Sequence, residues 1–132
     1  MNEKVGIDVM RSPLSRARGV GSAKSGVHHW HAQRVTAIAL VPLTLWFIFS
    51  MMRLAGAPQE VVAHWAGHPF NTVLLLALIA MTFHHMQLGI QVVLEDYVHD
   101  KWLMTGLILA NKAAAALLGL AAAVAVLKLA LA

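Results

Sequence analysis

The chain has 132 residues, enough for one domain, but only 12% of them are Asp, Glu, Lys or Arg, about half of the roughly 25% found in soluble domains. With 59% hydrophobic residues and a mean hydropathy of +0.68, the chain cannot cover a compact globule with polar surface. It contains no cysteine, which excludes disulfides, zinc–thiolate sites and iron–sulfur clusters held by this chain alone, and leaves eight histidines as candidate metal ligands.

The net charge of +4 is distributed as in a membrane protein and does not indicate a nucleic-acid partner. Six of the ten Lys and Arg residues lie within the first 34 positions. The first 25 residues contain no apolar core of signal-peptide length. We expect residues 1–25 to form an extended, poorly structured arm on the cytoplasmic side.

Three apolar segments predict an all-α membrane protein with three transmembrane helices, together forming one anchor domain over residues 26–132. The expected spans are residues 35–54, 70–95 and 103–130. The first contains 18 consecutive uncharged residues, just enough to cross a hydrocarbon core of about 30 Å at 1.5 Å per residue. The second contains 25, and the third is rich in Ala and Gly, which suit close helix contacts in lipid.

The charges and the connections between the spans predict the topology. Six Lys and Arg residues precede the first span, whereas Arg53 alone lies at its far end and in the link after it, so the N-terminus should be cytoplasmic and the C-terminus periplasmic. The link over residues 53–69 is expected at the membrane interface, as a loop or a short amphipathic helix. The link between the second and third spans has about seven residues, so these spans should be antiparallel neighbours.

Two adjacent histidines lie in the middle of the second span, where an ionisable side chain is unfavourable unless it faces a partner, a cavity or a cofactor. A lone histidine there would more often only hydrogen-bond another helix. At 100° per residue, however, His85 shares a face with Gly89, whose missing side chain leaves room for a flat macrocycle. His84 lies on a bulkier and more polar stripe. We therefore favour His85 as a haem iron ligand, with His84 as the alternative.

The depth of His85 predicts that a second polypeptide is needed. His85 lies about 16 Å below the cytoplasmic end of its span, and the histidines outside this span cannot comfortably reach that depth. A six-coordinate haem would therefore take its second axial ligand from another chain. This chain is expected to be one part of a hetero-oligomer.

Residues at the cytoplasmic ends of the first two spans are candidate contacts for the haem and for a quinone. Arg34 and His28 could bind haem propionates, or could simply be an anchor and an incidental histidine at the interface. Tyr97 beside Asp96 could hydrogen-bond a quinone carbonyl and help to deliver protons, although a tyrosine at this position is also a common membrane-interface anchor.

Two motifs resemble the hydrophobic membrane-anchor subunits of bacterial succinate dehydrogenase, the smaller of the two cytochrome b anchor polypeptides of respiratory complex II. The first is G-V-H at Gly26 to His28 with Arg34 six residues after the histidine. The second is H-x-x-x-G-x-x-x-x-x-x-D-Y, formed by His85, Gly89, Asp96 and Tyr97. The resemblance covers the chain from about residue 26 to the C-terminus.

The resemblance implies a role for each of these residues. His85 would ligate haem b opposite a histidine of the sister anchor subunit, with Gly89 packing beside the haem and His28 and Arg34 approaching its propionates. Tyr97 and Asp96 would help to form the ubiquinone site with the iron–sulfur and sister subunits. A flavoprotein subunit would oxidise succinate, so this chain, a multi-pass protein of the bacterial inner membrane, would not be catalytic alone.

Three other functions are compatible with parts of the sequence. A fumarate reductase or another quinone-linked cytochrome b complex would use the same parts. A small transporter could use histidines along a cation path, but the first span offers only Thr36, Thr44 and Ser50 as polar residues. A structural subunit without a cofactor is the third.

Overall fold

The computed structural model of the chain describes residues 12–18 and 24–132, and within these ranges every regular element is a helix. The helices are α1 (Pro13–Arg18), α2 (Lys24–Leu54), α3 (Gln59–Gly67), α4 (Pro69–Tyr97) and α5 (Lys101–Ala130). Helices α2, α4 and α5 are each long and apolar enough to cross a membrane. The predicted all-α fold with three spans is therefore confirmed.

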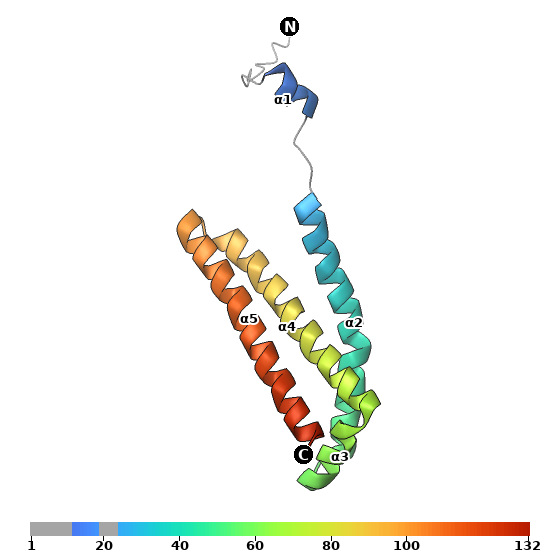
Figure 1. The fold of residues 1–132 in the computed structure, drawn as a ribbon. Coiled ribbons are helices and arrows are strands. Elements are labelled where there is room, and N and C mark those ends of the chain that lie inside the picture. Colours follow the sequence, from blue (N-terminus) through green and yellow to red (C-terminus); the bar gives the residue numbers. More distant parts are fainter. Residues whose placement is uncertain (1–11, 19–23) are drawn as a thin grey trace.

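Helix α4 is the central one of the three long helices, with α2 on one side and α5 on the other (Figure 1). In its most apolar stretch 17% of the residues are buried, against 6% in α2 and in α5. α4 and α5 are joined by a three-residue turn and lie side by side, as the short link predicted. Large apolar side chains remain exposed on all three long helices, an extensive surface of the kind that marks contact with a membrane or with another protein.

Helix α2 begins eleven residues before the span that hydropathy predicts, so the histidine-rich segment from Gly26 to Arg34 is helical. Hydropathy detects only the apolar part of a helix, whereas the main-chain hydrogen bonds continue into its polar end. Pro42 lies inside α2 without ending it. The helix ends in a turn where Gly56 has a φ of 78°, a left-handed conformation that glycine adopts without steric cost.

The arm before α2 is only partly described. Its residues 13–18 form the short helix α1, which differs from the extended chain expected there. Pro13 at the first helical position suits the fixed φ of proline, and Leu, Ala and Arg are good helix formers. Residues 1–11 and 19–23 of the predicted arm lie outside the described residues.

The link between the first two spans contains helix α3, and side chains of α4 fix the corner between them. Asn71 Nδ2 donates a hydrogen bond to the main-chain oxygen of Trp65 at 2.9 Å, and the Thr72 hydroxyl donates to that of Ala66 at 2.5 Å. Because the last carbonyl groups of a helix lack partners within it, these bonds stabilise the end of α3. The ring of Trp65 also stacks on Trp46 of α2, with 5.6 Å between ring centroids.

The end of α3 approaches the end of α5 so closely that only a glycine fits. A Cβ atom at Gly67 would lie 2.7 Å from the main-chain oxygen of Ala130. This contact joins α3 to α5 at the end of the bundle that is remote from Tyr97.

Candidate functional site

His85 lies on the α2 side of the central helix and is tied to α2 by a side-chain hydrogen bond. Its Nδ1 atom is 3.0 Å from the hydroxyl oxygen of Thr36. His85 is half-buried, and Thr36 is only 4% exposed. The other ring nitrogen of His85, Nε2, has no hydrogen-bond partner among the described residues. The side chain therefore has one nitrogen held by the protein and one free to bind another group.

The face of α2 toward His85 carries a polar stripe formed by His29, Gln33 and Thr36. Two buried atoms of this stripe, His29 Nε2 and Gln33 Oε1, have no hydrogen-bond partner within the described part of the chain. Gly89 of α4 faces the same stripe, since a Cβ atom built there would lie 3.7 Å from Gln33 Nε2. The face of α4 that the sequence assigned to a cofactor, with His85 and Gly89, thus packs against α2. The unsatisfied polar atoms at this contact belong to α2.

His84 is exposed and lies on the α5 side of α4, in a groove of about 430 Å³ between the two helices. Apolar side chains line most of this groove, and Lys112 of α5 is its one charged residue. His84 makes no hydrogen bond among the described residues. The two adjacent histidines therefore face different neighbours, as the 100° rotation per residue predicts.

Amide side chains satisfy the polar groups between His84 and the end of α4. Gln87 Nε2 donates to Gln91 Oε1 at 3.1 Å, and Gln91 Nε2 donates to Glu95 Oε1 at 2.8 Å. Asn111 Nδ2 of α5 donates to the main-chain oxygen of Gln87 at 2.9 Å. The first two bonds lie within α4, whereas the bond from Asn111 joins α5 to α4, as polar side chains commonly do between membrane helices.

The two residues predicted to bind propionates are both exposed, and they do not meet each other or His85. Arg34 places its guanidinium 5.4 Å from the centroid of the Trp30 ring, a cation–π contact. His28 is exposed near the start of α2. His29, which the sequence analysis did not select, is the histidine of this segment with a buried, unpaired ring nitrogen.

Tyr97 and Asp96 form the exposed end of α4. Tyr97 is 79% exposed, and neither side chain has a hydrogen-bond partner among the described residues. From Tyr97 to His85 the helix rises about 18 Å, at 1.5 Å per residue. The predicted quinone residues are therefore accessible to another subunit, at a different depth from the predicted haem ligand.

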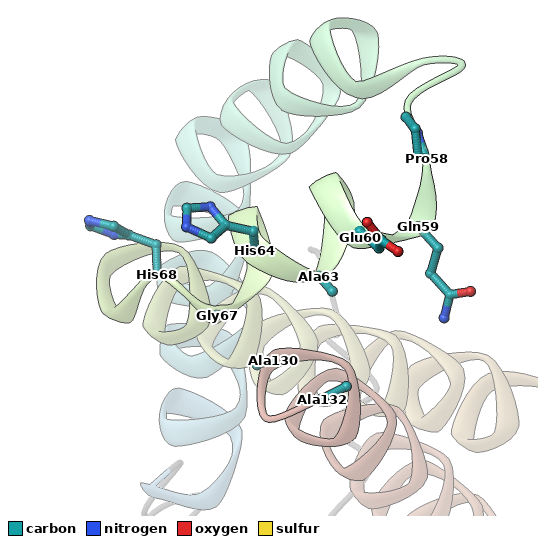
Figure 2. Close-up of a pocket in the computed structure, with 9 residues that line it drawn as sticks. All are labelled: Pro58, Gln59, Glu60, Ala63, His64, Gly67, His68, Ala130 and Ala132. Atoms are coloured by element: carbon teal, nitrogen blue, oxygen red, sulfur yellow. The ribbon is translucent and has the colours of Figure 1, made fainter.

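A hollow of about 760 Å³ lies at the other end of the bundle, between α3 and the end of α5 (Figure 2). His64 and His68 lie together on one side of it, whereas Gln59 and Glu60 lie on the other side, at the start of α3. Throughout residues 12–18 and 24–132, no three His, Asp or Glu side chains form a group that could hold a metal ion. None of the predicted site residues lines this hollow.

His29, Gln33 and Thr36 are the site residues that the sequence analysis missed. Their signal was present in the spacing, because positions 29, 33 and 36 are separated by four and three residues and so share one helical face. The apolar residues of a membrane helix surround such a face on all sides, so the pattern alone does not show which helix covers it.

Three long apolar helices with large exposed apolar surfaces are typical of an integral membrane protein. The family model of the succinate dehydrogenase/fumarate reductase transmembrane subunit matches residues 8–127. This chain belongs to that family.

Curated relatives support the same assignment. The succinate dehydrogenase hydrophobic membrane anchor subunit of Rickettsia bellii is 37% identical over 102 residues, which cover 77% of this chain and 82% of that protein. The protein of the same name from Paracoccus denitrificans is 31% identical over 86 residues, covering 65% of this chain and 67% of that protein. No solved structure significantly matches the chain.

Proposed function

We propose that this chain is the membrane anchor of a succinate:ubiquinone oxidoreductase, in which it holds haem b together with a sister anchor subunit and contributes to the site of ubiquinone reduction. The single observation that supports haem binding best is the state of His85. Its Nδ1 atom is hydrogen-bonded to the Thr36 hydroxyl, and its Nε2 atom has no hydrogen-bond partner among the described residues.

The residues around His85 fit a haem. Imidazole nitrogen is a common axial ligand of haem iron, and the second ring nitrogen of such a ligand is almost always hydrogen-bonded by the protein. The unpaired His29 and Gln33 atoms on the facing helix are polar groups that still need partners. Bound haem would supply a one-electron redox centre. The chain's own contribution would be His85 as a ligand of the iron, beside the polar stripe of α2.

The exposed apolar faces support an assembly in which other subunits and lipid cover the three long helices. We propose the sister anchor, iron–sulfur and flavoprotein subunits as partners in the bacterial inner membrane. The excess of Lys and Arg before α2 supports a cytoplasmic N-terminus and a periplasmic C-terminus. Tyr97 then lies at the cytoplasmic side, and the hollow beside α3 at the periplasmic side.

Arg34 and His28 are proposed to bind the haem propionates, with Gly89 packing near the haem. A guanidinium pairs with a carboxylate through two parallel hydrogen bonds, and the exposed Arg34 is free of an acidic partner among the described side chains. His29 is a further candidate for this contact, because its buried Nε2 atom lacks a partner.

Tyr97 and Asp96 are proposed to face ubiquinone. Succinate oxidation in the flavoprotein releases two electrons and two protons, and ubiquinone takes up two of each to become ubiquinol. A phenol can donate a hydrogen bond to a quinone oxygen as negative charge develops on it, and a neighbouring carboxylate can pass on protons. Both side chains are exposed at the end of α4, where iron–sulfur and sister subunits could complete the pocket.

Optical spectra of the purified complex carrying His85→Ala or His84→Ala test the haem assignment. We expect His85→Ala to abolish or strongly reduce the haem b signal in the reduced-minus-oxidised spectrum, because an axial ligand is lost. His84→Ala is the matched control, since His84 lies on a different face of the same helix, toward α5. Subunit content should be measured in both preparations.

A haem signal that survives His85→Ala and disappears in His84→Ala would move the site to the groove between α4 and α5. A wild-type complex without haem would leave only the anchoring role. The relative rates of succinate:ubiquinone and quinol:fumarate turnover then test the direction in which the complex works. The names of the relatives favour succinate oxidation.

A further inference from the structure

We propose that Thr36 is a positioning residue for the haem. Its hydroxyl accepts a hydrogen bond from His85 Nδ1, which fixes the ring in the Nδ1–H form and leaves Nε2 as the iron ligand. This inference rests on the proposed role of His85.

The proton of the Thr36 hydroxyl has two possible acceptors within its own helix. The hydroxyl oxygen lies 2.7 Å from the main-chain oxygen of Ala32 and 3.1 Å from that of Gln33. Carbonyl oxygens can only accept, and threonine in membrane helices commonly donates to the carbonyl group one turn earlier. The contact with Ala32 is also shorter than the 3.0 Å contact with His85.

A hydroxyl has a single proton, so donation to Ala32 leaves only its lone pairs for His85. The contact of 3.0 Å can then be a hydrogen bond only if His85 Nδ1 carries the hydrogen. In a neutral imidazole one nitrogen bears a hydrogen and the other a lone pair. Nε2 is therefore the nitrogen with the lone pair, which is the form that binds iron.

Because Thr36 is buried, water cannot easily replace its hydroxyl as the hydrogen-bond partner of His85. Thr36 is 4% exposed and lies on the face of α2 that packs against α4, so water has little access to its hydroxyl. The contact also joins two helices at positions 49 residues apart in the chain. Thr36 can thus set both the protonated nitrogen and the rotation of the ring.

The bond should also influence the redox potential. Donation of the Nδ1 hydrogen to an acceptor makes the imidazole a stronger base at its other nitrogen. A more basic ligand stabilises ferric over ferrous iron and lowers the midpoint potential. Loss of the acceptor should therefore raise the potential and weaken haem retention.

The test uses Thr36→Val and Thr36→Ser in the complete complex in its native lipid or detergent. Valine keeps the branched shape but removes the hydroxyl, whereas serine keeps the hydroxyl. Thr44→Val is the matched control, because Thr44 is an exposed threonine on the same helix that has no contact with His85. The readouts are the haem midpoint potential, the electron paramagnetic resonance spectrum of the ferric haem, and haem retention during dilution.

We expect Thr36→Val to raise the midpoint potential, to shift the ferric spectrum, and to weaken haem binding by about 10- to 100-fold, the usual effect of losing such a supporting bond. Thr36→Ser should restore all three readouts toward wild type, and Thr44→Val should leave them unchanged. This pattern would separate a positioning role from simple packing.

Other outcomes would overturn the inference in distinguishable ways. If His85→Ala abolishes the haem but Thr36→Val keeps the wild-type potential and spectrum, haem ligation stands and the role of Thr36 is wrong. If His85→Ala retains the haem, the ligand assignment itself fails and this inference fails with it. Thr36→Ala is a smaller hydroxyl-free variant for the case that Thr36→Val does not assemble. If neither assembles while Thr36→Ser does, the hydroxyl serves helix packing and the proposed positioning role is rejected.

Discussion

The substitution Tyr97→Phe removes one hydroxyl at the end of α4 and should separate quinone chemistry from assembly. Tyr97 is 79% exposed and makes no hydrogen bond within the described chain, so folding should change by no more than about 0.5 kcal/mol. If the phenol donates to the charge that develops on the quinone, its removal should lower the rate by roughly 10²–10³-fold, the range known for single donors of this kind.

Two activities measured on the same membranes distinguish these effects. Reduction of ubiquinone should fall about 100-fold or more. Succinate oxidation with a water-soluble dye, which takes electrons before the quinone site, should stay close to wild type, because the free energy of folding should change by no more than about 0.5 kcal/mol. Haem content should be unchanged, because Tyr97 lies about 18 Å along the helix from His85.

Trp102→Phe is a suitable control for the loss of an interface anchor. Trp102 is an 88% exposed aromatic residue near the start of α5, at the same end of the bundle as Tyr97. The Trp102→Phe variant should keep both ubiquinone reduction and dye reduction close to wild type. Full ubiquinone activity in Tyr97→Phe would reduce the tyrosine to a membrane anchor, and an equal loss with dye and with quinone would indicate failed assembly.

Two further substitutions test the other parts of the molecule. Arg34→Leu should keep the axial ligand but shift the haem midpoint potential, because an unpaired propionate loses a charge-assisted hydrogen bond of about 1.5–3 kcal/mol; an unchanged potential and haem content would leave Arg34 as the partner of Trp30 only. Gly67→Ala should destabilise the complex by about 1–3 kcal/mol, because the added Cβ atom would lie 2.7 Å from a main-chain oxygen of α5. Thermal inactivation of the complex measures this loss, and Gly106→Ala, which meets no atom within 4 Å, should not reproduce it.

The three long helices could be predicted from the sequence because long uncharged apolar segments have few structures available to them in a membrane. The ends of the helices were less predictable. Helix α2 extends through His28, His29 and His31, where hydropathy is low but the main-chain hydrogen bonds continue. For the link that contains α3, the sequence allowed either a loop or a short helix, because a segment of nine residues carries little periodic signal.

The separation of His84 from His85 could also be predicted, because helical rotation places adjacent side chains about 100° apart. The neighbours of each face could not. In a water-soluble protein, polar residues mark the exposed side of a helix, but lipid-facing and helix-facing positions are both apolar in a membrane helix. Nothing in the sequence therefore distinguishes Thr36 from other polar residues of the first span. The packing of α2 on α4 brings its hydroxyl to His85.

The same packing explains why the polar stripe on α2 favours an assembled complex over a lone chain. His29 Nε2 and Gln33 Oε1 are buried without hydrogen-bond partners among the described residues, and each buried, unsatisfied polar group typically costs about 1–3 kcal/mol. Polar side chains inside a membrane helix almost always face a partner or a water-filled cavity. Thr36, in contrast, is already satisfied by Ala32 and His85. The stripe thus has one residue, Thr36, whose hydroxyl is already hydrogen-bonded, and two residues with buried atoms to which the proposed haem or another subunit could supply partners.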